Sequence, residues 1–204
     1  MVETQIRPRG IRDPAVLGAM ERVPRHHFVP PEYYGQAYGD HPLPIGYGQT
    51  ISQPYIVALM TELLHVAPES LVLEIGTGCG YQAAVLAEIV REVYSVEIVP
   101  ELAEQTARRL GDLGYTNIHV RHADGYEGWP EHAPYDGVIV TAAASEVPPP
   151  LIEQLADGGR MVIPVGAYLG GQDLWLLEKH GHEVQRRNYG GVLFVPLTRR
   201  RRGG

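Results

Sequence analysis

Three glycines in one short segment are the residues of this sequence with the clearest capacity to bind a ligand. Gly76, Gly78 and Gly80 follow an apolar run at 71–75 that predicts a buried strand, and a helical pattern begins at Tyr81. Glycines let the backbone turn sharply and approach a ligand closely, because they have no Cβ atom. In open α/β sheets, ligands bind at such strand ends, where the strand order reverses. The segment therefore predicts a small-molecule site, with a tight turn that binds nothing as the alternative.

Acidic residues around this segment indicate which kind of molecule binds. Glu97 ends the next predicted strand, where its carboxylate can accept hydrogen bonds from both hydroxyls of a ribose. Dinucleotide sites use a similar acid, but their loop has the spacing G-x-G-x-x-G, whereas this loop has G-x-G-x-G. Glu74, just before the loop, would repel a pyrophosphate and suit a cationic amino-acid ligand. Asp124, followed by Gly125, can accept a hydrogen bond from an adenine amino group, so the set favours S-adenosylmethionine over a nicotinamide dinucleotide.

Composition and charge narrow the class of protein. The chain has 204 residues, of which 44% are hydrophobic and 20% charged, and this suits one α/β domain with a well-buried core. A net charge of −7 argues against a nucleic-acid partner, and the four arginines at 199–202 are interpreted as a solvated tail. The sequence has a single cysteine, no secretory signal and no apolar run of about 18 residues. We therefore expect a cytoplasmic protein without a membrane partner, and we expect a monomer.

Strand and helix patterns alternate from residue 71 onward, which predicts an α/β fold with a mostly parallel sheet and helices on both faces. Before this region, Asp13 is the expected N-cap of a helix at 13–23, and Ser52 is placed to cap a helix at 53–65. Gly158 and Gly159 are expected to end the last helix. The predicted strands are 71–75, 92–98, 117–121, 135–141 and 160–164, the helices between them are 81–90, 100–113 and 147–155, and antiparallel strands at 174–177, 183–189 and 192–197 close the sheet edge.

We expect residues 1–204 to form a single domain with four parts. These are N-terminal helices with a substrate and cofactor loop (1–70), a cofactor-binding core (71–166), C-terminal strands (167–198) and a tail (199–204).

Two segments resemble protein-L-isoaspartate O-methyltransferases. They are the stretch from Leu43 to Pro54, LPIGYGQTISQP, and the glycine-rich stretch from Val72 to Ala87. The glycine loop is common to many methyltransferases, whereas the stretch from Gly48 to Pro54 is specific to this family. Cys79 departs from the serine that is common in bacterial relatives, and we expect it to leave cofactor binding intact. Shorter matches are Pro134-Tyr135-Asp136, Thr141-Ala142-Ala143, Gly158-Gly159-Arg160, Pro164-Val165-Gly166 and Val195-Pro196-Leu197, so the resemblance extends from Val23 to Leu197.

The resemblance implies a Rossmann-like methyltransferase fold with added N-terminal helices and C-terminal strands. It also implies methylation of L-isoaspartyl and D-aspartyl residues in damaged proteins, which starts their repair through succinimide formation. Ser52 would be the active-site residue, and Thr50, Ser52, Val192 and Phe194 would contact the peptide substrate. The expected cofactor contacts are Thr50, Ile51, Ser52, Glu74, Gly76, Thr77, Gly78, Gly80, Glu97, Ile98, Asp124 and Gly125.

The expected chemistry needs no general base, because the accepting carboxylate is already ionised at neutral pH. Alignment and exclusion of water can then supply the rate, with Ser52 donating the hydrogen bond that aims the carboxylate. On spacing alone, Ser52 could instead be only a helix cap. The nine histidines have no partner ligands at metal-binding spacing, so we expect no metal. Other possible functions are methylation of RNA or of a small carboxylic acid, nicotinamide oxidoreduction, and cofactor binding without catalysis.

Overall fold

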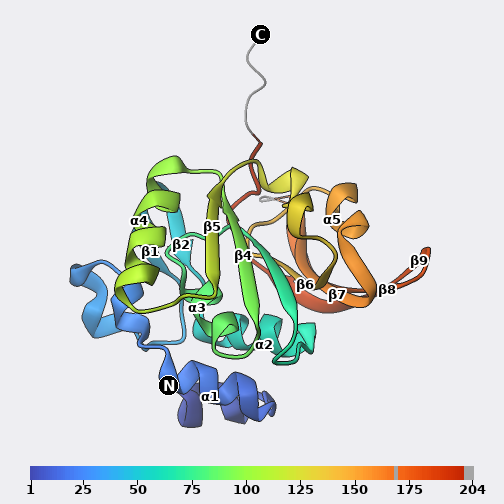
Figure 1. Ribbon diagram of the computed structural model, residues 1–204. Helices are drawn as coiled ribbons and strands as arrows, with labels where there is room; N and C mark the ends of the chain where they lie inside the picture. The colour runs from blue at the N-terminus through green and yellow to red at the C-terminus, as the bar shows by residue number, and fades with distance from the viewer. Residues whose placement is uncertain (168–169, 200–204) are drawn as a thin grey trace.

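A seven-stranded sheet forms the centre of the computed structural model, which describes residues 1–167 and 170–199 (Figure 1). The strand order is β5-β4-β3-β6-β7-β8-β9. The first five of these pair in parallel, whereas β8 and β9 form an antiparallel meander on β7. The strands are β3 (Leu71–Ile75), β4 (Glu92–Glu97), β5 (Ile118–His122), β6 (Tyr135–Val140), β7 (Leu155–Ala167), β8 (Gly171–His180) and β9 (Glu183–Val192), and a separate hairpin comprises β1 (Leu43–Gly46) and β2 (Gln49–Ile51).

Helices cover both faces of the sheet, because successive residues of a strand point to opposite sides. In β3, Val72 packs with residues of α2 and α3, whereas Leu73 packs with Leu151 of α5. The helices are α1 (Pro14–Arg22), α2 (Pro54–Leu64), α3 (Tyr81–Ala87), α4 (Pro100–Asp112) and α5 (Pro149–Glu153), with short turns η1 (Val2–Ile6), η2 (Arg7–Arg9), η3 (Arg25–Phe28), η4 (Pro31–Gln36), η5 (Gly125–Glu127) and η6 (Pro130–His132). The predicted fold class is confirmed.

The strand order reverses at β3. The chain continues from β3 to β4 and β5 on one side, then returns to β6 on the other side of β3. Loops leaving the carboxyl ends of β3 and β6 therefore diverge and leave a crevice between them. The expected ligand-binding segment, residues 76–80, leaves β3 at this point.

One predicted helix is shorter than expected, and two other predictions about local structure are wrong. The helix expected at 147–155 covers only Pro149–Glu153, and Lys179 Nζ donates hydrogen bonds to carbonyls at its C-terminal end. Gly158, with φ of 76°, lies inside β7, where the register with β6 shifts, so the glycines form a bulge rather than a helix stop. The strand expected at 192–197 is absent, because β9 ends at Val192 and a single bridge joins Pro196 to Ala143.

Across the described ranges 1–167 and 170–199, no helix has the length and apolar character needed to cross a bilayer. The arginine tail predicted at 199–202 lies outside the described residues, except for Arg199. The Arg199 guanidinium carbon lies 4.1 Å from the centre of the Tyr126 ring.

Candidate functional site

A cleft opens at the carboxyl ends of β3, β4 and β6. The space between its walls is about 780 Å³ and opens to solvent. Its lining residues are Gln49, Thr50, Ile51, Ser52, Val57, Ile75, Gly76, Thr77, Gly78, Cys79, Tyr81, Gln82, Val96, Glu97, Ile98, Gly125, Thr141, Ala142, Val195, Pro196, Leu197 and Thr198.

The glycine loop takes a backbone path that other residues adopt only with strain. Gly76, Gly78 and Gly80 have φ values of 96°, 53° and 89°, which lie in the left-handed region that favours glycine. A Cβ at Gly80 would lie 2.7 Å from Thr106 Cγ2, and one at Gly78 would lie 3.3 Å from Ile45 Cδ1. The glycines are thus required by the turn and by packing of protein atoms, in addition to any ligand.

Side chains from α4 and from the end of β6 hold the carbonyl groups of this loop. Thr106 Oγ1 donates to the Gly78 carbonyl at 2.6 Å, and Arg109 Nη1 donates to the Cys79 carbonyl at 2.9 Å. On the other side, Thr141 Oγ1 donates to the Gly76 carbonyl at 2.5 Å. The loop's N–H groups and its shape are therefore set before any ligand arrives.

Glu97 ends β4 and faces the cleft with only 5% of its surface exposed. Its Oε2 accepts from the Gly78 N–H at 2.8 Å, and its Oε1 accepts from the Val99 N–H at 2.9 Å. Each carboxylate oxygen can accept more than one hydrogen bond. Glu97 is thus held rigidly, and its oxygens retain capacity for further hydrogen bonds, while its contact with a ribose stays a prediction.

Glu74 lies behind the glycine loop and does not line the cleft. It is fully buried, and its Oε2 accepts from the Ser95 hydroxyl, which in turn lies 2.6 Å from Thr77 Oγ1. Burial raises the pKa of the Glu74 carboxyl to about 8, so this group holds a proton at neutral pH. The expectation that its charge repels a pyrophosphate or attracts a cationic ligand is therefore wrong, and we assign Glu74 to support of the loop through Ser95 and Thr77.

Asp124 and Gly125 begin the short turn η5 at the β5 end of the cleft. The Asp124 carboxylate caps this turn, because its Oδ1 accepts from the Tyr126 N–H at 3.0 Å. Gly125 lines the cleft, whereas Asp124 lies beside it. The Asp124 Oδ2 atom has no hydrogen-bond partner among the residues that the structure describes.

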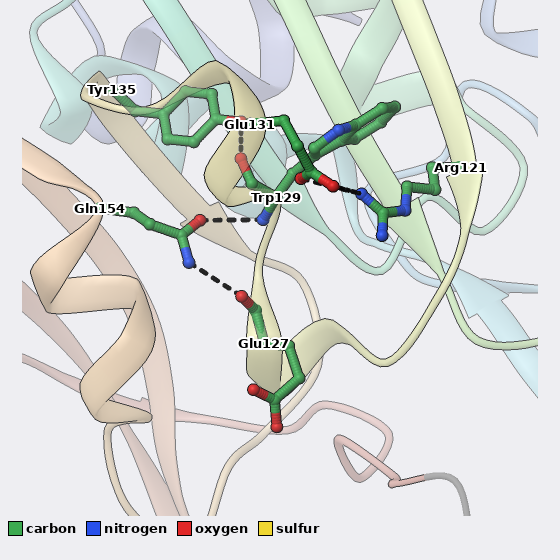
Figure 2. Close-up of polar contacts among 6 residues, drawn as sticks. All are labelled: Arg121, Glu127, Trp129, Glu131, Tyr135 and Gln154. Carbon is green, nitrogen blue, oxygen red and sulfur yellow. Dashed lines mark hydrogen bonds and ion pairs between the residues drawn. The ribbon is translucent and has the colours of Figure 1, made fainter.

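Gln154 fixes the segment that follows Gly125 (Figure 2). Its Nε2 donates to the Glu127 carbonyl at 2.8 Å, and its Oε1 accepts from the Trp129 N–H at 2.8 Å. Tyr135 Oη donates to the Trp129 carbonyl at 2.6 Å. The Gln154 amide thus satisfies two backbone groups of this loop, as a neighbouring strand would. It thereby helps to position Gly125 in the cleft wall.

Ser52 enters the cleft from the segment between β2 and α2, and its hydroxyl has no partner among the described protein groups. The N-cap of α2 is Gln53, and the first free N–H groups of the helix include that of Tyr55, which donates to Asp40 Oδ1 at 2.9 Å. The alternative in which Ser52 only caps the helix is therefore wrong. The Ser52 hydroxyl is available to a ligand.

The β1–β2 hairpin covers one side of the glycine loop. Ile45 packs against Gly78, and Tyr47 Oη accepts from Gln105 Nε2 of α4 at 2.9 Å. The hairpin thereby brings Thr50 and Ile51 to the cleft, where the sequence predicted them.

The C-terminal wall of the cleft differs from the prediction. Val192 and Phe194 do not line it. Phe194 is 7% exposed and packs in the core with Leu174. The Gln172 side chain accepts from the Phe194 N–H at 2.7 Å and donates to its carbonyl at 3.0 Å. The lining residues are instead Val195 to Thr198, which Ala143 holds through its backbone N–H and carbonyl.

The structure brings together most of the predicted cofactor residues. Thr50, Ile51, Ser52, Gly76, Thr77, Gly78, Glu97, Ile98 and Gly125 line the cleft, whereas Glu74, Gly80 and Asp124 stand behind or beside it. Prediction of individual roles missed Val57, Gln82, Thr141 and Ala142. Gln82, Thr141 and Ala142 all lie in segments that carry the family resemblance, so a signal for them was present, whereas Val57 lies outside those segments.

Cys79 is buried, and burial raises the pKa of its thiol, which makes it a poor nucleophile at neutral pH. In the part of the chain that the structure describes, no three His, Cys, Asp or Glu side chains gather closely enough to hold a metal ion. What the cleft offers is hydrogen-bonding groups and an apolar wall.

Proteins of one family are similar to this chain over nearly its full length. Residues 1–202 match the family described as protein-L-isoaspartate(D-aspartate) O-methyltransferase. A protein-L-isoaspartate O-methyltransferase of Picosynechococcus sp. is 59% identical over 97% of this chain and 88% of its own length. One of Gloeobacter violaceus is 55% identical over 98% of this chain and 97% of its own length.

Solved structures of similar proteins agree with this match. A structure described as a protein-L-isoaspartate O-methyltransferase has a TM-score of 0.87 at 32% identity and aligns with 93% of this chain, which covers 62% of that longer chain. A Plasmodium falciparum structure with the same description, in complex with S-adenosyl-L-homocysteine, has a TM-score of 0.79 at 26% identity over 94% of both chains. With the glycine loop, Glu97 and Ser52 arranged around one cleft, this chain belongs to the protein-L-isoaspartate(D-aspartate) O-methyltransferase family.

Proposed function

We propose that this chain transfers a methyl group from S-adenosylmethionine to the free α-carboxylate of L-isoaspartyl residues, and to the β-carboxylate of D-aspartyl residues, in damaged proteins. The observation that carries the proposal is that the free Ser52 hydroxyl and the braced Glu97 carboxylate line the same cleft. The first suits an anionic acceptor group and the second suits a ribose. The matched family supports the same reaction.

The cofactor fits the half of the cleft between the glycine loop and η5. Glu97 would accept from the ribose hydroxyls, and Asp124 Oδ2 would accept from the adenine amino group beside Gly125. The loop at Gly76 to Gly78 would lie under the amino-acid end. When bound, S-adenosylmethionine supplies an electrophilic methyl group on a sulfonium.

The protein's part in the reaction is alignment. An isoaspartyl carboxylate is ionised at neutral pH and is itself the nucleophile, so no side chain has to remove a proton. Ser52 would donate one hydrogen bond to this carboxylate and orient the other oxygen toward the methyl group. Ile51, Val57 and Leu197 supply apolar walls that exclude water. Such orientation is worth on the order of 7–11 kcal/mol in well-aligned reactions.

The product would be a methyl ester, which the neighbouring backbone nitrogen can attack, losing its proton while the methoxy group leaves as methanol. The resulting succinimide can reopen to a normal aspartyl linkage, which is why methylation starts repair. We also propose that the chain acts as a cytoplasmic monomer and a single domain, with damaged proteins and peptides as partners and without nucleic acid or membrane partners. The net charge of −7 supports the lack of a nucleic-acid partner.

The experiment is methyl transfer from labelled S-adenosylmethionine to two peptides of identical sequence, one with an aspartyl and one with an isoaspartyl linkage. We expect label in the isoaspartyl peptide alone, released as methanol by alkali. Equal labelling of both peptides, or alkali-stable label, would overturn the proposal. Titration with S-adenosylhomocysteine and NADH separates a methyltransferase from a nicotinamide enzyme, since only the first ligand should bind.

A further inference from the structure

Gln82 is a polar residue of the cleft that has no role in the proposed methyl transfer. It is the second residue of α3, it lines the cleft, and only 7% of its surface is exposed. A nearly buried amide is costly unless both of its ends find partners. Only one end finds a partner within the described protein.

The orientation of the Gln82 amide is fixed by a chain of two hydrogen bonds. The Thr61 hydroxyl donates its single proton to the Val57 carbonyl at 2.7 Å, and Thr61 is fully buried. Thr61 Oγ1 can therefore only accept from Gln82. The amide nitrogen Nε2 must be the atom that faces Thr61, at 2.9 Å.

The carbonyl oxygen Oε1 of Gln82 is consequently the free end. No hydrogen bond to it exists among the described residues. The fully enclosed side-chain atoms that lack partners in those residues are on Gln5, Arg25 and Glu74. Gln82 Oε1 is not one of them and so keeps accessible surface, and Gln82 is a cleft residue. The cleft thus contains a fixed hydrogen-bond acceptor that a ligand can use.

The position of this acceptor indicates which ligand uses it. Thr61 and Val57 belong to α2, which packs on β6 and β7 and follows directly after Ser52. Glu97 lies at the end of β4, on the opposite side of β3. α3 itself packs on β4 and β5, but the hydrogen bond to Thr61 ties the Gln82 side chain to α2, the helix that begins just after Ser52. An acceptor cannot bind a carboxylate, but it can bind a peptide N–H.

We propose that Gln82 Oε1 accepts a hydrogen bond from the backbone N–H of the residue that follows the isoaspartyl residue in the substrate. The isoaspartyl linkage adds a methylene to the main chain and so moves this N–H relative to the carboxylate. Ser52 would bind the carboxylate and Gln82 would bind the N–H. Both hydrogen bonds can form only when these two groups have the spacing of an isoaspartyl linkage. Gln82 is then a specificity-determining residue, and this inference rests on the proposed function.

The test compares two peptides, one with the amide after the isoaspartyl residue and one with an ester oxygen in place of that N–H. Wild-type protein should use the ester peptide with about 10-fold lower kcat/KM, in line with the loss of one hydrogen bond. In Gln82→Met, kcat/KM for the amide peptide should fall by a similar factor, and the two peptides should become equal. The Kd for S-adenosylhomocysteine should stay within about 2-fold of wild type. Gln185→Met, on exposed β9, is the matched control and should behave as wild type.

Equal use of the amide and ester peptides by wild-type protein would overturn the inference, and this result requires no folded variant. A parallel loss of S-adenosylhomocysteine affinity in Gln82→Met would also overturn it, since Gln82 would then bind the cofactor. Failure of wild-type protein to methylate the amide peptide at all would instead contradict the proposed function. The two failures are therefore distinguishable.

Discussion

Arg25 Nη2 donates a 2.8 Å hydrogen bond to the backbone carbonyl of Ser52, and Arg25 is completely buried. Its Nε donates to the Ala37 carbonyl, also at 2.8 Å, and its guanidinium lies over the Tyr81 ring. Burial lowers the pKa of this guanidinium from its usual value, yet an arginine remains charged at neutral pH. A buried cation thus fixes the backbone at Ser52, the residue that we propose aims the substrate.

Arg25→Met should weaken both the fold and the reaction. Two carbonyls lose charged donors, while the cost of burying the cation disappears, so we expect a net loss of about 1–3 kcal/mol in the free energy of unfolding. We also expect kcat to fall by about 10-fold, because Ser52 is less well held. Urea unfolding and steady-state kinetics measure the two effects. Arg22→Met is the control, since its ion pair with Glu88 is at the surface and should contribute less than about 1 kcal/mol. Equal losses of stability and of kcat in the two variants would show that Arg25 does not hold Ser52 in place.

Ser52→Ala should separate catalysis from stability. Since Ser52 does not cap α2, the free energy of unfolding should change by less than about 0.5 kcal/mol. Loss of the aiming hydrogen bond should lower kcat by about 10- to 100-fold. Asp40→Ala provides the contrast, because Asp40 accepts from the Tyr55 N–H at the start of α2 and should cost about 1 kcal/mol of stability. A Ser52→Ala protein with full turnover would show that the hydroxyl does not aim the carboxylate.

Glu97→Gln should damage cofactor binding. The new amide places an NH₂ group against the N–H of Gly78 or of Val99, both of which now donate to the carboxylate. We expect the Kd for S-adenosylhomocysteine to rise by about 30- to 100-fold, since charge-assisted hydrogen bonds to the ribose are lost as well. Calorimetric titration measures this change, with exposed Glu101→Gln on α4 as the control. Unchanged affinity in Glu97→Gln would place the ribose elsewhere.

Glu74 should make stability depend on pH in a direction opposite to that of most carboxylates. Its pKa is about 8 in the folded protein and about 4.3 in an unfolded chain. Between these values the folded state binds the additional proton, so stability is greatest below about pH 4.3, falls as pH rises, and levels off above about pH 8. The contribution of this group has a limiting slope of about 1.4 kcal/mol per pH unit.

The measurement for Glu74 is urea unfolding of wild type and Glu74→Gln at pH 5, 6, 7 and 8. Because glutamine has no such titration, the stability of the variant should increase relative to wild type as pH rises. A difference between the two proteins that does not change with pH would mean that Glu74 is ionised in the folded state.

Much of the fold could be predicted from the sequence because its signals are local. The apolar run at β3, the glycine loop after it and the acid at the end of β4 are read directly from residue types. The parallel sheet follows from their alternation with helices. Even the position of Asp13 as the N-cap of α1 is confirmed, with its carboxylate accepting from the Ala15 N–H.

The remaining errors come from contacts between residues far apart in the chain. The sequence predicts a ligand contact for Glu74, but its buried position depends on Ser95 in the neighbouring strand. The family resemblance implies a substrate contact for Phe194, but hydrogen bonds from Gln172, 22 residues earlier, hold Phe194 in the core. Local alternation cannot tell which face of an isolated strand-like segment is buried. Gln82 was missed for a similar reason, since only Thr61 on α2 reveals the orientation of its amide.

We propose that the protein aligns an acceptor that is already ionised and performs no proton transfer. The most direct test is the single-turnover rate of methyl transfer to an isoaspartyl peptide, with enzyme in excess and saturated with S-adenosylmethionine, between pH 5.5 and 7.5. In this range the carboxylate is fully ionised, so the rate should vary by less than about 2-fold. A rate that rises about 10-fold per pH unit would show that a side chain must lose a proton before reaction, and it would contradict this mechanism.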